Sequence, residues 1–219
     1  MKVLKSYECM NACILNHMNR AGIKINGSDI FFSGGGYPVS YKKGSLTHIV
    51  SDGYEANFCF LDRYGLDYKF GRILPERKSL LSFLENSEAI TIKMVSDFLT
   101  YDPVFSQTNG ASHFINIQKY DSDKMRFYIE DGDVPSAETG TYLGWLDESN
   151  VLKGWEISCG EIFVLKLPEN LDREKICQRV REEANSQVKR SIKCYLDGAD
   201  HFWLSRSTGE KAISRMVKE

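Results

Sequence analysis

A cysteine near the start of the chain, together with a histidine and an aspartate far downstream, could perform acyl-group chemistry. Cys9 falls in the first turn of a predicted helix, where the helix dipole and exposed backbone N–H groups favour a thiolate, the nucleophilic form of the side chain. His113 can act as a general base, and Asp131 can hold its imidazole in one tautomer. The composition and chain order predict a Cys–His–Asp triad for nucleophilic catalysis.

Sequence arithmetic places the histidine and the aspartate on one hairpin. The polar stretch 121–123 predicts a three-residue turn, so that Tyr120 pairs with Lys124 and His113 faces Asp131. In that register one face of the hairpin is apolar and ends in the His/Asp pair. A two-residue turn would divide the apolar residues between both faces, so the longer turn is favoured. The pair could equally be a structural hydrogen bond without a catalytic role.

The elements that must position these residues follow from the spacing of the apolar side chains. A helix from Cys9 to Ala21 carries the nucleophile, and Gly22 is placed to end it. Turn-forming residues predict loops at 33–38 and 99–110. Helices are also predicted at 54–64, 76–86 and 172–196, and strands at 46–50, 89–95, 112–120, 124–131, 141–146 and 161–167. Helix first, strands in the middle and helices last is the order of an α+β chain.

The C-terminal third differs from the rest of the chain in its pattern of apolar and polar residues. We predict a catalytic core over residues 1–167 and a C-terminal helical segment over residues 168–219. Ser207 and Glu210 have the spacing of a capping box, which predicts a last helix running toward Val217. The long helix has an apolar stripe that packs on the same domain or on a second subunit, as in a homodimer. The stripe consists of Ile176, Val180, Ala184, Val188 and Ile192.

The overall composition excludes several classes of protein. The 219 residues are 42% hydrophobic and 26% charged, which describes an ordinary globular domain. The 28 Lys and Arg against 30 Asp and Glu give a net charge of −2, so a nucleic-acid partner is not expected. We find no apolar run of membrane-spanning length and no export signal, and therefore expect a cytoplasmic protein that does not bind membranes and whose six cysteines are thiols.

Five short segments carry a resemblance to a known family. They are Tyr7-Glu8-Cys9-Met10-Asn11-Ala12, Ser33-Gly34-Gly35-Gly36-Tyr37, Asp97-Phe98-Leu99-Thr100-Tyr101-Asp102, Ser112-His113-Phe114-Ile115 and Tyr128-Ile129-Glu130-Asp131. In this order they resemble the BtrH-like acyltransferase family of butirosin biosynthesis, which is similar in turn to C39 peptidases. The chain also resembles the cysteine-protease-like amide synthetases of closthioamide (polythioamide) biosynthesis. The resemblance implies a papain-like fold, with an N-terminal nucleophile helix packed on an antiparallel sheet.

The same resemblance implies an activity and the roles of three residues. Such an enzyme takes an acyl group from the phosphopantetheine thioester of a carrier protein and delivers it to an amine, without ATP and without a cofactor of its own. Cys9 matches the nucleophile, His113 the base and Asp131 the orienting carboxylate. The expected function is therefore that of an amide synthetase in thiotemplated natural-product biosynthesis.

Partners and substrate contacts follow from this expectation. The partners would be an acyl or peptidyl carrier protein and a small amine, for example a diamine. A carrier protein needs only a local basic patch, for which Lys42-Lys43 and Arg72 to Lys78 are candidates. We expect no metal, and we expect substrate-binding residues at Gly35, Gly36, Tyr37 and Asp97.

One position departs from the pattern of C39 peptidases. These enzymes carry a glutamine six residues before the nucleophile as an oxyanion donor, and Val3 occupies that position here. The oxyanion would have to rely on backbone N–H groups near Cys9, or on Tyr7 or Asn11, and each such donor is worth about 3–4 kcal/mol of barrier. A cysteine peptidase using the same triad is the alternative function, which this departure makes less favourable.

A third interpretation is a non-catalytic binding or metal module. Cys9, Cys13 and His17 follow each other at intervals of four residues, as metal ligands on a helix do. However, Cys9 and His17 would lie about 12 Å apart along a helix axis. Zinc ligands lie only about 2.0–2.3 Å from the ion, so these three residues cannot share one metal.

Overall fold

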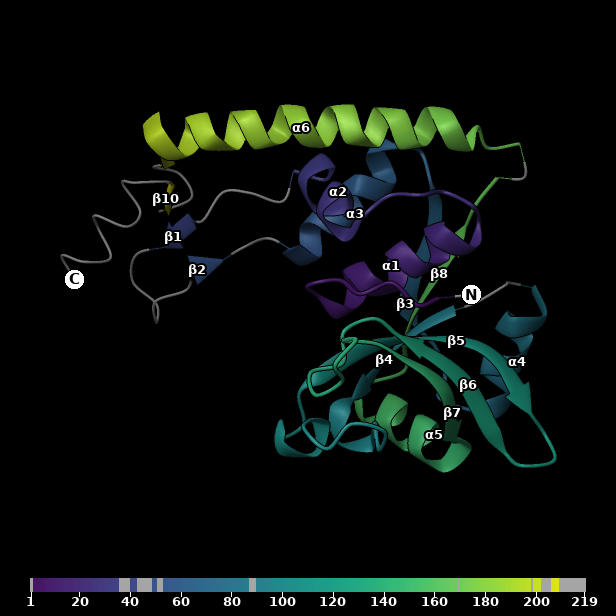
Figure 1. The fold of residues 1–219 in the computed structure, drawn as a ribbon. Helices are drawn as coiled ribbons and strands as arrows, with labels where there is room; N and C mark the ends of the chain where they lie inside the picture. The colour runs from purple at the N-terminus through teal and green to yellow at the C-terminus, as the bar shows by residue number, and fades with distance from the viewer. Residues whose placement is uncertain are drawn as a thin grey trace. The chain divides into compact units, whose positions relative to one another are not determined.

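The computed structural model describes residues 2–35, 40–42, 49–50, 53–86, 90–168, 170–197, 199–201 and 206–208 (Figure 1). The chain divides into two compact units, Met1–Gly27 with Gly65–Arg173 and Ser28–Tyr64 with Glu174–Glu219. All three residues of the predicted triad belong to the first unit.

A six-stranded antiparallel sheet forms the centre of the first unit. Its strand order is β3 (Asp67–Arg72), β8 (Glu161–Lys166), β4 (Ile90–Val95), β5 (Ser112–Asp121), β6 (Arg126–Asp131) and β7 (Tyr142–Asp147). The central strands are rich in β-branched and aromatic residues, which pack well on a pleated surface. Helices together with an antiparallel sheet confirm the predicted α+β class.

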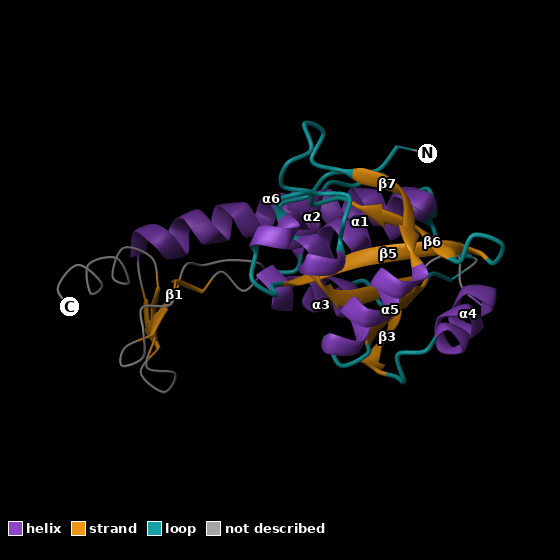
Figure 2. Ribbon diagram, turned by 90° about the horizontal axis from the view of Figure 1, so that it is seen from below, coloured by secondary structure: helices purple, strands orange, loops and turns teal. Residues whose placement is uncertain are grey.

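Two helices cover opposite faces of this sheet, α1 (Cys9–Arg20) and α5 (Glu148–Ile157) (Figures 1 and 2). Side chains alternate across a strand, so Thr91 and Asn116 contact α1, whereas Ile92 and Ile115 pack in the core with Trp155 of α5. Helix α4 (Arg77–Asn86) connects β3 to β4. Two short 3-10 helices, η1 (Ser96–Phe98) and η2 (Phe105–Gln107), precede β5.

Buried polar side chains hold α1 in one position on the sheet. His17 Nε2 lies 3.0 Å from Thr91 Oγ1, and the Thr91 hydroxyl donates to Asn116 Oδ1 over 2.6 Å. Asn116 Nδ2 donates to the carbonyl oxygen of Cys13 over 3.1 Å. All four residues are buried, and a buried polar group that loses its partner costs free energy. This network therefore fixes the position of the helix.

An ion pair anchors the other end of the same helix. Arg20 donates to Glu130 Oε2, and Asn116 Nδ2 donates to the same oxygen over 3.0 Å. The Glu130 side chain is 1% exposed and that of Arg20 is 11% exposed. Because α1 is attached along its length, the place of its first residue, Cys9, is determined too.

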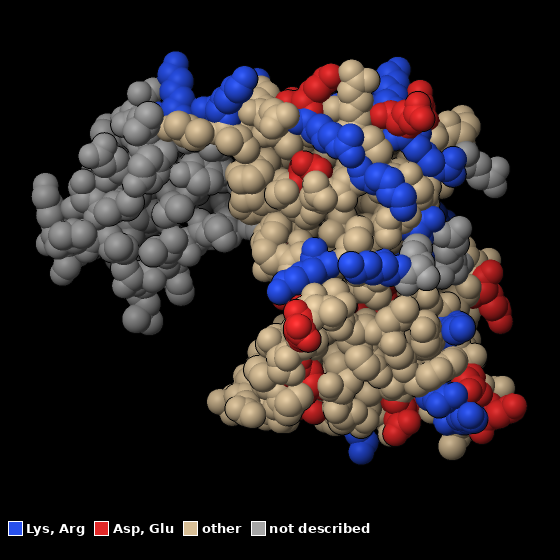
Figure 3. Space-filling model, in the orientation of Figure 1, with Lys and Arg blue, Asp and Glu red and all other residues tan. Residues whose placement is uncertain are grey.

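The second unit contains α3 (Gly53–Arg63) and most of α2 (Gly27–Ser33) and α6 (Arg173–Asp197). It also contains a four-stranded sheet in the order β2 (Ile49–Val50), β1 (Ser40–Lys42), β10 (Arg206–Thr208) and β9 (Ala199–His201). Arg63 joins its helices, because its Nη1 donates to the Ser33 carbonyl oxygen over 2.5 Å and to Glu183 Oε1 over 3.1 Å. Along α6, basic and acidic side chains are intermixed (Figure 3).

The hairpin register predicted from the sequence is wrong. Ile117 pairs with Ile129, two positions further along than the predicted Phe127, and a bulge follows Ile117. The turn spans residues 122–125, one residue longer than predicted, with Met125 in the left-handed region at φ 48°. Since side chains alternate with a period of two, the two-residue offset before the bulge left Ile115 and Ile117 on the predicted apolar face. Beyond the bulge the offset is three residues, and Tyr120 pairs with Phe127.

Among the described helices and strands of the first 160 residues, α2, β1, β3 and α5 were not predicted from the sequence. Helix α5 follows β7 directly, with Asp147 at its N-cap position, and buries Val151 and Trp155, which are four residues apart, against the sheet. The prediction had left this stretch between two strands without a helix.

The C-terminal predictions need correction. Ser207, expected to cap a helix, lies in β10, where it pairs with Tyr41 and Asp200, because strand pairing overrides a local capping signal. Residues 209–219 lie outside the described residues. Residues 28–64 group with α6 in the second unit, and so the units differ from the predicted division at residue 167.

The apolar stripe of α6 is buried over its first half only. Ile176, Val180 and Ala184 are buried, whereas Ile192 is 57% exposed. A homodimer formed through this helix stays a prediction. None of the helices in the described part of the chain is both long and apolar enough to cross a membrane.

Candidate active site

The nucleophile candidate stands at the first position of α1, as the sequence predicts. The residue before it, Glu8, caps the helix: its carboxylate accepts from the backbone N–H groups of Met10 and Asn11 over 2.9 and 2.8 Å. The half-buried Cys9 Sγ lies 3.6 Å from Glu8 Oε1. A helix N-terminus favours negative charge, and here the Glu8 carboxylate and the Cys9 thiol both lie at that end of α1.

A glycine lets the start of the chain and α1 approach the end of β6. A Cβ built on Gly132 would lie 2.4 Å from the Leu4 carbonyl oxygen and 2.9 Å from Ala12 Cβ. The carbonyl oxygen of Gly132 accepts from the backbone N–H of Ser6 over 3.0 Å. No larger residue fits this place without moving the backbone, so Gly132 helps to bring Cys9 beside the residues that follow β6.

The histidine and the aspartate meet at the same edge of the sheet, where β5 begins and β6 ends. His113 Nε2 lies 2.8 Å from Asp131 Oδ2, and both side chains are buried. The ring of Phe105 packs on the imidazole with the centroids 4.7 Å apart. Because Nε2 is held by the carboxylate, Nδ1 is the ring nitrogen left for proton exchange with Cys9.

The electrostatics of this arrangement favour a protonated imidazole. Burial of the His113 ring opposes protonation, but hydrogen bonds to Asp131 and Cys9, and the attraction of both groups, outweigh it and raise the pKa of His113 to about 10. A protonated His113 is a counter-ion for a thiolate at Cys9. An imidazolium–thiolate pair is the resting form of an activated cysteine nucleophile.

A tyrosine that was assigned no role from the sequence supports the carboxylate. The Tyr101 hydroxyl donates to Asp131 Oδ2 over 2.6 Å, the oxygen that also binds His113. Its ring stacks on Tyr142 with the centroids 4.0 Å apart and the planes 7° apart. Burial and the neighbouring Asp131 raise the pKa of Tyr101 well above its ordinary value, so the hydroxyl remains a donor.

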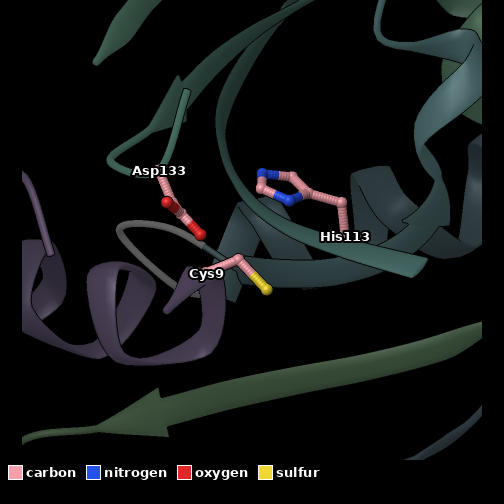
Figure 4. A group of neighbouring side chains, drawn as sticks. All are labelled: Cys9, His113 and Asp133. Atoms are coloured by element: carbon pink, nitrogen blue, oxygen red, sulfur yellow. The ribbon is translucent and has the colours of Figure 1, made fainter. Parts of the chain in front are cut away.

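A second aspartate faces the nucleophile, and the sequence analysis missed it. One ligand-type atom from each of Cys9, His113 and Asp133 lies within 4.8 Å of the other two (Figure 4). The backbone N–H of Asp133 donates to Asp131 Oδ1 over 2.9 Å. Burial raises the pKa of Asp133, the nearby Asp131 and Glu8 act in the same sense, and His113 opposes them.

A simple signal could have revealed this residue. In Asp131-Gly132-Asp133 the two carboxylates stand two positions apart at the end of a strand, a spacing that directs both to one side. The sequence analysis used only the first of the pair because the predicted register placed it opposite His113.

The candidate oxyanion donors lie around the N-terminus of α1. Val3, at the position of the expected glutamine, is buried and only 7% exposed. The Asn11 amide is engaged, donating to the Tyr7 hydroxyl over 3.0 Å and accepting from the Ser6 hydroxyl over 2.6 Å. The backbone N–H groups of Met10 and Asn11 donate to the Glu8 carboxylate, and the Tyr7 hydroxyl accepts from Asn11, so the backbone N–H of Cys9, at the first position of α1, is the candidate donor.

Of the predicted substrate-binding residues, only Asp97 is described in the same unit as this cluster. Asp97 is exposed and accepts from the backbone N–H of Gly110 over 3.1 Å, so its observed contact stabilises a loop. Gly35, at φ 84°, belongs to the second unit. Gly36 and Tyr37 lie outside the described residues.

The predicted basic patch at residues 72–78 is balanced by acidic neighbours. Arg72 lies 3.2 Å from Glu161, and Lys78 lies 2.8 Å from Glu76. The other predicted patch is described only in part, since residue 43 falls outside the described residues.

Cys13 and His17, which have the spacing of metal ligands on a helix, are buried against protein neighbours. His17 is buried between Thr91, 3.0 Å from its Nε2, and Arg20, 3.0 Å from its Nδ1, so both ring nitrogens have protein neighbours. Burial, with the nearby Arg20, lowers the pKa of His17 well below its ordinary value. Cys13 is buried as well, and the two residues contribute to the packing of α1 on the sheet.

Comparison with known proteins gives a likeness at the level of the fold. The chain matches no protein-family model, and none of the curated proteins is a significant match. A solved structure from Bacillus anthracis, provisionally described as a C39-like peptidase, is similar with a TM-score of 0.49 and 10% identity over 76% of this chain and 94% of that one. At this level the likeness does not decide the function, which must be inferred from the side chains.

Proposed function

We propose that this protein is an amide-forming acyltransferase of papain-like fold, related to the BtrH-like family. In this proposal Cys9 accepts an acyl group from the phosphopantetheine thioester of a carrier protein and passes it to an amine. The observation that carries the proposal is the convergence of Cys9, His113 and Asp131 at the N-terminus of α1, with the imidazole held by the carboxylate at 2.8 Å.

The first half-reaction transfers the acyl group to the enzyme. The Cys9 thiolate attacks the thioester carbonyl, and the tetrahedral oxyanion is stabilised by the backbone N–H of Cys9. Collapse of this intermediate breaks the bond to the pantetheine sulfur, which takes the proton of the His113 imidazolium. The products are an acyl-Cys9 thioester, a free pantetheine thiol and a neutral imidazole.

The second half-reaction forms the amide. The neutral amine attacks the acyl-Cys9 carbonyl while His113 Nδ1 accepts a proton from the nitrogen, and Cys9 leaves as a thiolate beside the imidazolium. Thioester to amide is downhill, so no ATP is consumed. Asp133 supports an amine acceptor, because a carboxylate beside the thiol can bind the second, protonated nitrogen of a diamine.

Intact mass spectrometry tests this function. The protein is incubated with acyl-carrier thioesters, and the adduct is mapped; a diamine, a peptide or buffer alone is then added. We expect an acyl adduct on Cys9 in wild type and in Cys59→Ala, which removes an exposed thiol, and none in Cys9→Ala. Amine-dependent release as the amide supports the proposal.

Two results would overturn it. One is peptide hydrolysis as the only activity, which would assign a cysteine peptidase. The other is acylation that persists in Cys9→Ala, which would remove Cys9 from the role of nucleophile.

A further inference from the structure

Three metal-binding types of side chain in the site come from three separate segments of the first unit. Cys9 begins α1, His113 lies at the second position of β5, and Asp133 follows β6. Figure 4 shows the His113 ring directed toward the side on which Cys9 and Asp133 lie. One sulfur, one nitrogen and one oxygen thus converge within 4.8 Å of one another.

We propose that Cys9, His113 and Asp133 form a zinc(II) site that competes with acylation of the thiol. A thiolate, an imidazole and a carboxylate are the ligand types that zinc binds best. Three protein ligands leave the fourth tetrahedral position open to water. The ion would occupy the sulfur and the ring nitrogen that the acyl-transfer reaction needs.

Zinc binding requires the three donor atoms to move only a short distance toward one another. Zinc bonds of about 2.0–2.3 Å place the donors of a tetrahedral site about 3.5 Å apart, against separations of up to 4.8 Å here. The contraction of about 1 Å is within reach of side-chain rotation at Cys9, whose sulfur would leave its contact with Glu8 Oε1 at 3.6 Å. The other two donor residues, His113 and Asp133, are both held in place by Asp131.

Asp131 lies behind the proposed zinc ligands and orients two of them. Its Oδ2 holds His113 Nε2 and so presents Nδ1, and its Oδ1 accepts the backbone N–H of Asp133. A carboxylate behind a metal-binding histidine fixes the ring orientation and strengthens the ligand. The charges of Asp131, Asp133 and Glu8 also favour a divalent cation at this place.

The charge and proton balance of binding is simple. Zinc binds cysteine as a thiolate and histidine as a neutral imidazole, so a proton shared by the side chains of Cys9 and His113 is displaced when the ion binds. Zinc takes the sulfur, the freed His113 Nδ1 and the Asp133 carboxylate, and one proton is released to solvent. No oxidant, reductant or covalent step is involved.

The test measures metal binding directly and does not depend on acyl transfer. In a Cys59→Ser/Cys159→Ser background, which removes two exposed thiols, zinc affinity is measured by competition with a chromophoric chelator. Alkylation of Cys9 by iodoacetamide is followed by intact mass with zinc, with magnesium, and without metal. Cobalt(II) substitution reports a sulfur–metal bond through its charge-transfer absorption.

We expect one bound zinc per chain. Zinc should slow the alkylation of Cys9 at least about tenfold, and magnesium should not. The cobalt-substituted protein should show a charge-transfer band that Cys9→Ser abolishes. Asp133→Asn, and Asp133→Ser as a second variant, should weaken zinc binding at least about tenfold, because Asp133 is a direct ligand and loss of even an outer-layer partner costs about 10- to 100-fold. Asp123→Asn, in the exposed turn between β5 and β6, is the matched control and should bind zinc as the parent does.

Absence of zinc protection at Cys9 would overturn the proposal. Equal affinity in the Asp133 variants and the parent would do the same, because it would mean that zinc binds to thiol and imidazole alone. Since no carrier protein or amine is present, either result leaves the acyltransferase proposal to be judged by its own experiment.

Discussion

At the scale of single residues, the two oxygens of Asp131 organise the site. One binds both His113 and Tyr101, and the other binds the backbone of Asp133. The carboxylate therefore orients the base and also fixes the loop that brings a second acid toward the thiol. Tyr101 is a positioning residue, because it acts on His113 only through Asp131.

Replacing this tyrosine tests the arrangement. Tyr101→Phe removes the hydrogen bond to Asp131 Oδ2, so the carboxylate charge is less satisfied and attracts the imidazolium more strongly. We expect the pKa of His113 to rise further above its ordinary value, and stability to fall by about 1.5–3 kcal/mol, as for other hydrogen bonds to charged groups. His113 titration by NMR and urea unfolding measure the two effects.

Tyr142→Phe is the matched control for this change. This variant keeps the ring that stacks on Tyr101. The hydroxyl group that it removes donates in the wild type to the Trp145 carbonyl oxygen over 3.1 Å and not to Asp131. The same His113 titration curve in both variants would show that Tyr101 does not act on the base.

At the scale of elements, the site depends on how α1 is attached to the sheet. Cys9 is at one end of this helix, and the buried pair of Arg20 and Glu130 is at the other. The pair has lost most of its contact with water, so removal of one partner leaves an unpaired charge in the interior.

Glu130→Ala should therefore be strongly destabilising. The substitution leaves the Arg20 guanidinium without its ion-pair partner and removes a hydrogen-bond acceptor of Asn116. We expect the free energy of unfolding, measured with urea, to fall by about 3–5 kcal/mol, as for other broken buried ion pairs. Glu138→Ala, at an exposed position, is the control and should change stability by less than about 0.5 kcal/mol. A loss below 1 kcal/mol in Glu130→Ala would contradict this account of how α1 is anchored.

At the scale of the whole molecule, the protonated histidine couples folding to pH. The pKa of His113 rises from 6.5 to about 10 in the folded chain. A raised pKa means that the folded state holds the proton more tightly. The stabilising contribution is therefore complete below pH 6.5, declines as the pH increases, and is lost above about pH 10.

Thermal unfolding of wild type and His113→Gln between pH 6 and 10 measures this contribution. We expect the melting temperature of wild type to fall with increasing pH more steeply than that of His113→Gln, so that the difference between the two shrinks toward pH 10. Parallel curves would mean that His113 is not protonated in the folded protein at neutral pH.

The sequence by itself determined the local features of this protein. It predicted a helix that begins at Cys9, the α+β class, and the hairpin on which His113 and Asp131 lie. These features could be predicted because helix and strand periodicity depend on residues that are close together in the sequence. Tertiary structure decided the rest. The hairpin register, the approach at Gly132, and the convergence of Tyr101 and Asp133 on the triad all depend on contacts between segments far apart in the chain. Only packing can select among such contacts, because local spacing can direct Asp131 and Asp133 to one side but does not determine which distant segment will meet that side.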